Sequence, residues 1–182
     1  EEMAMTQSDL LILTSSDLYQ RFSNKNKNSI LVRNGCEFDF FNTKPDVVYS
    51  GNYEKIIGYY GAISSWFDTE MLINLAKYFS NYEFLLVGST YGCENLDKLK
   101  KLKNVTLIEE VEYSQLTQYL YAFDVAIMPF KVNELTIATN PVKVYEYLSS
   151  AVSVVATKLP EIDYVGNVVY PANSLEEFIN QI

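Results

Sequence analysis

Residues 125–156 have the sequence VAIMPFKVNELTIATNPVKVYEYLSSAVSVVA. This stretch begins with a continuous apolar run, 125–128, and ends with a second run, 152–156, that is apolar except for Ser153. Between them, a helical pattern follows Asn140, which we expect to be the N-cap, with Pro141 at the first helical position, where its missing N–H would be unpaired anyway. The order of strand, helix and strand is typical of two parallel strands joined by a crossover helix.

The same order continues along the rest of the chain. Four more apolar runs occupy residues 56–60, 84–88, 105–108 and 168–170. All but the third, which contains Thr106, are uninterrupted, as in strands covered by helices on two faces. The runs are about 15 to 30 residues apart, which leaves room for crossover helices. We therefore predict an α/β fold, a doubly wound, mostly parallel, Rossmann-like sheet of about six strands with helices on both faces. Ligands of such folds bind beyond the carboxyl ends of the strands.

Three helices are predicted from apolar residues spaced three and four apart. The first follows Asp68 as N-cap, the second follows Ser114 as N-cap, and the third is the helix after Asn140. We expect the following residues to face the sheet: Leu72, Leu75, Ala76 and Phe79 in the first helix, Leu116, Tyr119, Leu120 and Phe123 in the second, and Val142, Tyr145 and Leu148 in the third.

The composition excludes several classes of function. The 182 residues include 14 Lys and Arg against 23 Asp and Glu, a net charge of −9, so we expect no nucleic-acid partner. The chain has no histidine, which excludes His-based triads and histidine-ligated zinc, and its two cysteines form no metal cluster. We expect neither a metal nor a cofactor. A mostly unbridged chain suits a reducing compartment, so the protein is predicted to be cytoplasmic. Without a basic leader or an apolar run of about 20 residues, we expect no targeting segment and no membrane span.

The segment before residue 45 has a different organisation. It holds two short apolar runs and one helical pattern, at residues 10–13, 29–32 and 16–23. We expect residues 1–45 to be the last βα unit of a preceding domain plus a linker. Residues 46–182 are then the sheet domain, truncated at its C-terminus, because the helical pattern at 174–178 has no end signal.

The start of the helix after Asn140 is a candidate anion site, because free N–H groups and the positive end of the helix dipole meet there. Lys143 in the first turn adds a cation, and Glu146 lies three residues further on the same face. A cation for phosphate beside a carboxylate for sugar hydroxyls fits a nucleotide sugar. The alternative is an ordinary surface pair. Neither a Gly-x-Gly-x-x-Gly nor a Gly-Lys-Ser/Thr motif is present, which argues against dinucleotide and ATPase sites.

At this point the residues resemble a known family. The run NPVKVYEYL (140–148), followed by VSVVATKLPE (152–161), is similar to the donor-site signature of bacterial group 1 (family 4) glycosyltransferases of GT-B fold. IGYYGAISSWFD (57–68) resembles the phosphate loop and following helix of that family, and VRNGCE (32–37) resembles its interdomain linker. The resemblance implies the nucleotide-sugar-binding C-terminal domain of a retaining enzyme, with residues 1–45 contributed by the N-terminal acceptor domain and the linker.

The resemblance also implies roles for individual residues. Glu146 would hold the ribose hydroxyls, and the backbone at Glu110 and Val111 would contact the base. The phosphates would meet the helix start and the loop after the first strand of the sheet domain, which together comprise Asn140, Pro141, Val142, Lys143, Gly61, Ala62 and Ser64. For Ser64 the alternative is a helix or turn cap. Lys143 and Glu146 are the expected catalytic residues.

Two departures from the family pattern leave roles to be filled. Many relatives carry an arginine and a lysine at the positions of Ala62 and Phe67, so Lys143, or alternatively Lys131, would have to neutralise the diphosphate. The first glutamate of the Glu-x7-Glu motif of the family falls at Ala138, so a contact to the transferred sugar is lost or is supplied by a neighbour such as Glu134.

The resemblance implies a donor-binding half that takes a sugar from a nucleotide diphosphate sugar. The acceptor would be a cell-surface polysaccharide or lipid-linked glycan, bound by the missing N-terminal half. The full-length protein could then associate peripherally with the inner face of the cell membrane. We expect this chain alone to bind nucleotide without transferring sugar. The alternative is a non-catalytic nucleotide-binding module that acts only with a separate partner chain. A GT-B sugar epimerase is a weaker third reading, because such sites usually employ histidine.

Overall fold

The computed structural model describes residues 2–182 and contains a six-stranded and a two-stranded sheet. In the larger sheet the strand order is β5-β4-β3-β6-β7-β8, and every neighbouring pair is parallel. The bounds are β3 Ile56–Tyr60, β4 Glu83–Val87, β5 Val105–Ile108, β6 Val125–Met128, β7 Ser153–Thr157 and β8 Val169–Ala172. The predicted α/β fold is therefore confirmed, and each predicted run differs from its strand by at most two residues at either end.

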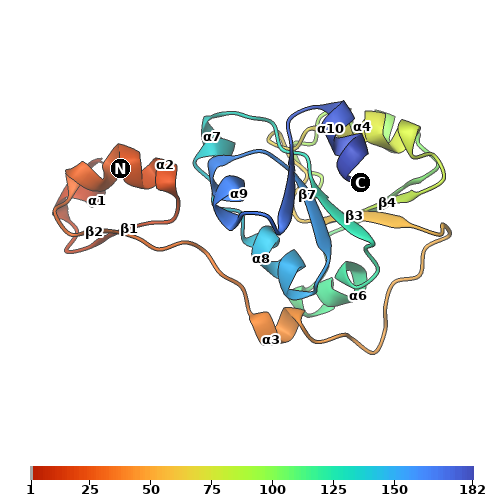
Figure 1. Ribbon diagram of the computed structural model, residues 1–182, viewed down its shortest axis with the longest axis horizontal. Coiled ribbons are helices and arrows are strands. Elements are labelled where there is room, and N and C mark those ends of the chain that lie inside the picture. The colour runs from red at the N-terminus through yellow and green to blue at the C-terminus, as the bar shows by residue number, and fades with distance from the viewer. Residues whose placement is uncertain (1) are drawn as a thin grey trace.

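Helices cover both faces of this sheet (Figure 1). Helices α4 and α10 pack together on one face, and α6 and α8 lie on the other. The bounds are α4 Thr69–Tyr78, α5 Leu96–Leu99, α6 Leu116–Leu120, α7 Glu134–Ile137, α8 Val142–Ser149, α9 Pro160–Val165 and α10 Leu175–Gln181. The prediction that Asp68 caps α4 is confirmed, because its side chain accepts a hydrogen bond from the backbone N–H of Met71, at 2.9 Å.

The core follows the alternation of side chains along β3. Tyr59 points to the α4 face, where its ring lies 4.7 Å from that of Phe67, and Tyr60 points to the α8 face, where its ring lies 4.9 Å from that of Tyr147. Such edge contacts between buried aromatic rings stabilise the packing beyond the area that they bury. Both faces of β3 are therefore buried, as the uninterrupted apolar run predicts.

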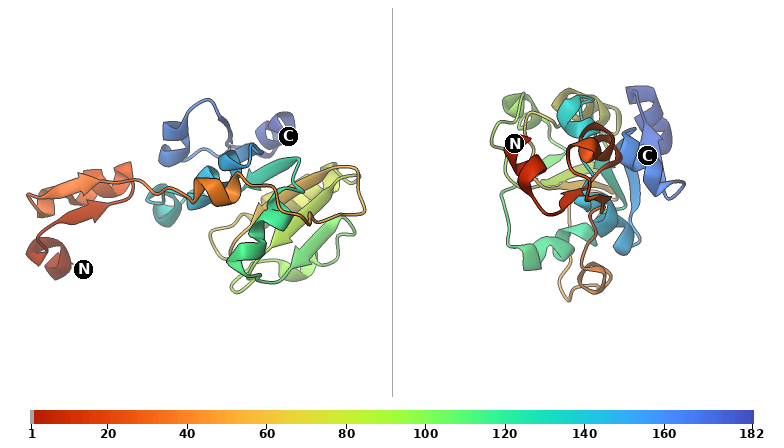
Figure 2. Two further views of the ribbon diagram at one scale, coloured as in Figure 1. Left: turned by 90° about the horizontal axis from the view of Figure 1, so that it is seen from below. Right: turned by 90° about the vertical axis from the view of Figure 1, so that its left-hand side faces the viewer.

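The N-terminal segment forms a separate unit at one end of the molecule (Figure 2). Its strands β1 (Leu11–Leu13) and β2 (Ser29–Leu31) pair in parallel. The helices of this segment are α1 Glu2–Gln7, α2 Ser16–Phe22 and the 3₁₀ helix η1 Ser23–Lys25. The chain then runs across the larger unit, where α3 (Phe38–Phe41) packs on α8. The division of the chain near residue 45 stays a prediction.

Two helix details differ from the sequence prediction. Ser114 is not an N-cap, because it lies inside a 3₁₀ turn, η2 (Tyr113–Gln115), that begins after Glu112 and leads into α6. The predicted inward face of α8 is also wrong, because the fully buried residues are Val144 and Tyr147. This helix is apolar around most of its circumference, so its pattern allowed more than one inward face.

Candidate functional site

A cavity of about 540 Å³ lies at the carboxyl ends of β3 and β4, beside the first turns of α8. It is lined by the ends of two strands, by the segment after β5 and by two side chains of α8. The residues are Tyr60, Gly61, Ala62, Val87, Gly88, Ser89, Glu110, Val111, Glu112, Tyr113, Leu116, Lys143 and Glu146. Since parallel strands present their carboxyl ends on one edge, this is the position where the fold predicts a ligand.

A close contact between two glycine turns shapes the floor of this cavity. Gly61 and Gly88 have φ angles of 125° and 139°, which other residues rarely adopt. A β-carbon on Gly61 would overlap the side chain of Lys143, and one on Gly88 would overlap the carbonyl oxygen of Gly61. The absence of side chains therefore lets Lys143 cross Gly61 and reach the cavity.

The side chain of Lys143 brings a cation to this cavity. Its side chain is half-buried, and within residues 2–182 no acceptor lies at hydrogen-bond distance from Nζ. Burial lowers the pKa of Lys143, and the nearby carboxylate of Glu146 opposes part of that change. A half-buried cation without a partner is suited to an anionic ligand.

Glu146 lies one turn further along α8 and is 8% exposed. Its Oε2 accepts a hydrogen bond of 2.8 Å from the hydroxyl of Tyr60. Burial raises the pKa of Glu146, while the Tyr60 hydrogen bond and the charge of Lys143 act in the opposite direction. Of the described donors, Tyr60 alone bonds this carboxylate, which leaves Oε1 available to a ligand. These positions do not match an ordinary surface pair, because both side chains line the cavity and Glu146 is buried.

Tyr60 is a further residue of this site. Its ring lines the cavity, and its backbone N–H and C=O both bond the hydroxyl of Tyr147, at 3.1 and 3.3 Å. Tyr147 belongs to the same helix as Glu146, so α8 and the end of β3 are tied together at two points. A polar aromatic residue at the carboxyl end of a buried strand was the signal that could have identified Tyr60.

A second cavity, of about 430 Å³, adjoins the first on the other side of Lys143. Ala62 and Lys143 line both cavities. The remaining lining comes from the segment after β2, from α7 and the loop that follows it, from the start of α8 and from nearby aromatic residues: Asn34, Tyr59, Trp66, Phe130, Leu135, Thr136, Thr139, Asn140, Pro141 and Val142. The start of α8 therefore faces two adjoining cavities.

Asn140 does not cap α8, contrary to the sequence prediction. Pro141 occupies the N-cap position without a side-chain hydrogen bond to the helix, and the helix begins at Val142. The side-chain amide of Asn140 is used elsewhere, because it donates to Tyr145 Oη at 3.0 Å and to Glu161 Oε2 at 2.9 Å. The first N–H groups of α8 consequently have no acceptor from a capping side chain.

Three other candidates lie outside both cavities. Ser64 is half-buried next to Gly92, and Glu134 is exposed at the first residue of α7, so neither lines a cavity. Lys131 forms an ion pair with Glu94, with 2.6 Å between Nζ and Oε2. Of the two lysines that could replace the missing cations of the family pattern, the structure places only Lys143 in the cavities.

A third cavity, also of about 430 Å³, continues along the same edge of the sheet beyond β4 and β5. It shares Gly88, Ser89 and Glu110 with the first cavity. The three cavities together line the carboxyl edge from the end of β5 to the loop before α8. Within residues 2–182, no group of three or more Cys, Asp or Glu side chains could hold a metal ion. No helix in that part of the chain is both long and apolar enough to cross a bilayer.

A Rossmann-like α/β domain with a cationic helix start at the carboxyl edge of its sheet belongs to a class that binds anionic ligands. The comparison with protein families defines the class further: a model described as glycosyl transferases group 1 matches residues 44–182. The chain therefore belongs to the group 1 glycosyl transferases.

One curated relative is TuaH of Bacillus subtilis (strain 168), named as a teichuronic acid biosynthesis glycosyltransferase. It is 30% identical over 135 residues, which are 71% of this chain and 34% of TuaH. The chain thus spans about a third of the length of this relative.

Solved structures share the fold. Sucrose-phosphate synthase from Thermosynechococcus elongatus has a TM-score of 0.69 and 17% identity over 99% of this chain and 49% of its own. Anabaena HepE, solved in complex with UDP and glucose, has a TM-score of 0.68 and 17% identity over 98% of this chain and 53% of its own. These likenesses agree with the GT-B expectation for the fold.

Proposed function

We propose that this chain is the donor-binding half of a retaining glycosyltransferase that takes a sugar from a nucleotide diphosphate sugar. One observation carries the proposal: α8 brings Lys143 and the buried Glu146 into the same cavity, and within residues 2–182 no acceptor bonds the ammonium group of Lys143. A donor of this kind has a diphosphate and ribose hydroxyls in adjacent positions, and these two side chains offer the complementary groups one helical turn apart.

The donor is laid out along the carboxyl edge of the sheet. The base lies near Glu110 and Val111, and the ribose hydroxyls bond Glu146. The diphosphate lies between Lys143 and the N–H groups at the start of α8, near Gly61 and Ala62. The transferred sugar enters the second cavity, beside Trp66 and Thr139.

The chemical role of this half is to stabilise the leaving group. When the bond between the anomeric carbon and the diphosphate breaks, negative charge develops on the diphosphate oxygens. The ammonium group of Lys143 and the oriented amides of α8 stabilise this charge, and because they are part of the folded site, little reorganisation is needed. The acceptor hydroxyl is presented by the N-terminal half, to which residues 1–45 contribute.

The names of relatives support the choice of substrates. HepE was solved with UDP and glucose, which supports a nucleotide sugar as donor. TuaH is named for teichuronic acid biosynthesis, which supports a cell-surface polysaccharide or lipid-linked glycan as acceptor. We propose that the protein acts in the cytoplasm, at the inner face of the cell membrane where such glycans are extended.

The proposed function is tested by calorimetric titration of the chain with UDP, GDP and ADP. We expect one of the three to bind more tightly than the others. We also expect no sugar transfer when its sugar conjugate is mixed with this chain and a glycan acceptor. If the folded chain binds none of the three, the proposed donor site is contradicted. Sugar transfer by residues 1–182 alone would contradict the assignment of acceptor binding to another part of the protein.

The affinity for the nucleotide sugar is expected to be highest at intermediate pH. Glu146 must be ionised to accept both ribose hydroxyls, so binding weakens as the pH falls through its raised pKa. Lys143 must be protonated, so binding weakens as the pH rises through its lowered pKa. Calorimetry across pH with Glu146→Gln as comparison should show the acid limb in the wild type only. An identical acid limb in both proteins would contradict this account.

A further inference from the structure

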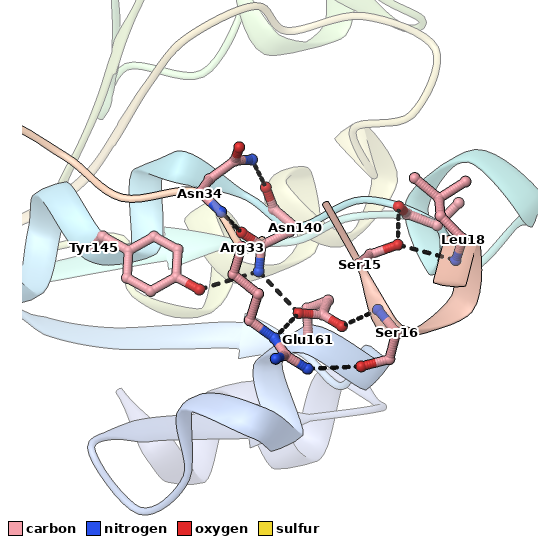
Figure 3. A network of polar contacts seen from close by, with 9 residues as sticks. Ser15, Ser16, Leu18, Arg33, Asn34, Asn140, Tyr145 and Glu161 are labelled. Atoms are coloured by element: carbon pink, nitrogen blue, oxygen red, sulfur yellow. Dashed lines mark hydrogen bonds and ion pairs between the residues drawn. The ribbon is translucent and has the colours of Figure 1, made fainter. Parts of the chain in front are cut away.

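A buried network of ionic and hydrogen-bonded side chains includes Asn140, two residues before the start of α8 (Figure 3). Its centre is Glu161 in the first turn of α9, whose side chain is 0% exposed. Three donors bond its carboxylate: the backbone N–H of Ser16 at 2.7 Å, Nε of Arg33 at 2.7 Å and Nδ2 of Asn140 at 2.9 Å. The donors come from the N-terminal unit, from the segment after β2 and from the loop before α8. Glu161 thus joins three parts of the chain that are far apart in sequence.

The same network holds Asn140 from its other side. Oδ1 of Asn140 accepts from the backbone N–H of Asn34 at 2.9 Å, and its carbonyl oxygen accepts from Nδ2 of Asn34 at 2.6 Å. Ser15 Oγ also donates to the carbonyl of Ala138 in the same loop, at 2.7 Å. Asn140 is 3% exposed, and both polar atoms of its side chain are hydrogen-bonded, which restrains its position.

This position determines where α8 begins. Asn140 is followed by Pro141, whose φ is restricted by its ring, and then by Val142 and Lys143, the first residues of the helix. Because no side chain caps the helix, the direction of its first N–H groups depends on the backbone that enters it. A displacement of Asn140 would therefore move the N–H groups and Lys143 but leave Glu146, one turn further on, held by Tyr60.

We propose that Glu161 is a positioning residue for the diphosphate, acting through Asn140 on the start of α8, and that Arg33 and Ser16 link this position to the N-terminal unit. The inference rests on the proposed function, because it concerns the same donor site. The segment that joins the two halves of the enzyme contains Arg33 and Asn34. Through Glu161 and Asn140 it also fixes the position of the groups that contact the diphosphate leaving group.

A carboxylate is required at position 161 because all three partners are donors. In a glutamine, one of the two carboxylate oxygens is replaced by an NH₂ group, which cannot accept a hydrogen bond. At least one of the three buried donors would then be left without an acceptor. Burial opposes the charge of Glu161, but the hydrogen bonds from Ser16 and Arg33 outweigh it and lower its pKa, so the group is ionised near neutrality. The guanidinium of Arg33 also stacks on the ring of Tyr164 in α9, 3.4 Å from its centroid, which keeps Arg33 in place.

The test compares Glu161→Gln with Glu83→Gln. Glu83 is an equally buried carboxylate, 1% exposed, at the opposite edge of the sheet, where it accepts bonds from the hydroxyls of Tyr49 and Thr106. Each variant is titrated with the best-binding nucleoside diphosphate and, by NMR, with the same nucleoside lacking phosphate. For Glu161→Gln we expect the diphosphate affinity to fall about 5- to 10-fold, the size of one weakened bond to a charged group. The nucleoside affinity should stay unchanged. Glu83→Gln should change neither affinity.

Arg33→Met is the second variant, because it leaves Glu161 in place and is expected to show the same selective loss for the diphosphate. Equal diphosphate binding by Glu161→Gln and the wild type would overturn the inference. An equal loss for the nucleoside would also overturn it, because that result indicates general damage to the site. If the wild type binds no nucleoside diphosphate, the proposed function fails and this inference fails with it, whereas the first two results leave the proposed function standing.

Discussion

Replacing Lys143 with methionine is expected to weaken binding of the nucleoside diphosphate by about 10- to 100-fold, the range for a lost hydrogen bond to a charged group. Methionine keeps an unbranched side chain that can still cross Gly61, so the variant removes the charge and not the packing. The ammonium group forms no hydrogen bond or ion pair within residues 2–182, so its loss breaks no such contact, and Glu146, which loses a neighbouring cation, keeps its hydrogen bond from Tyr60. Calorimetry measures the change in affinity.

Lys131→Met is the matched control for this substitution. Lys131 is also a lysine near the carboxyl edge of the sheet, but it pairs with Glu94 and lines neither of the two cavities at the start of α8. We expect its affinity to stay within about twofold of the wild type, because surface ion pairs contribute little. An equal loss in both variants, or no loss in Lys143→Met, would contradict the role given to Lys143.

Glu146→Gln is expected to lower the affinity by a similar factor, about 10- to 100-fold, because a carboxylate accepts both ribose hydroxyls and a neutral amide offers one acceptor. The loss should disappear when the ligand is the 2′,3′-dideoxy form of the nucleoside diphosphate, which has no hydroxyl to donate. Titration of both proteins with both ligands separates the contact from a general effect on the fold.

Two further variants complete this experiment. Glu134→Gln, at an exposed position outside both cavities, should bind like the wild type. Tyr60→Phe removes the hydroxyl that orients Glu146 and should give a smaller loss than Glu146→Gln. A loss in Glu146→Gln that is the same with the dideoxy ligand would show that Glu146 does not hold the ribose.

The fold could be predicted from the sequence because its signal is local. Each strand of the six-stranded sheet coincides with a mainly apolar run such as residues 56–60, and Asp68 marks the start of α4 by its own side chain. The start of α8 could not be predicted in the same way. Asn140 has the residue type of an N-cap, but its amide bonds Glu161 and Tyr145, and contacts with residues 5 and 21 positions away compete with local capping.

The sequence indicated the residue types of the candidate site better than their positions in space. The spacing of Lys143 and Glu146 places them on one helix face, and the cavity at the carboxyl edge contains both. Ser64 and Glu134 were predicted to contact the donor, but they lie outside the two cavities at the start of α8, because loop conformation decides where such side chains go. The Tyr60 hydroxyl and the Glu161 network depend on contacts across 86 and up to 145 positions of the sequence, which no local pattern records.

A crystal structure of the chain with the best-binding nucleoside diphosphate tests the central claim most directly. We expect the ribose hydroxyls within about 2.5 to 3.0 Å of the Glu146 carboxylate, the usual range for O–H···O hydrogen bonds. The diphosphate should lie between Lys143 and the first N–H groups of α8. A nucleotide bound with its ribose away from Glu146, or its phosphates away from the start of α8, would contradict the account.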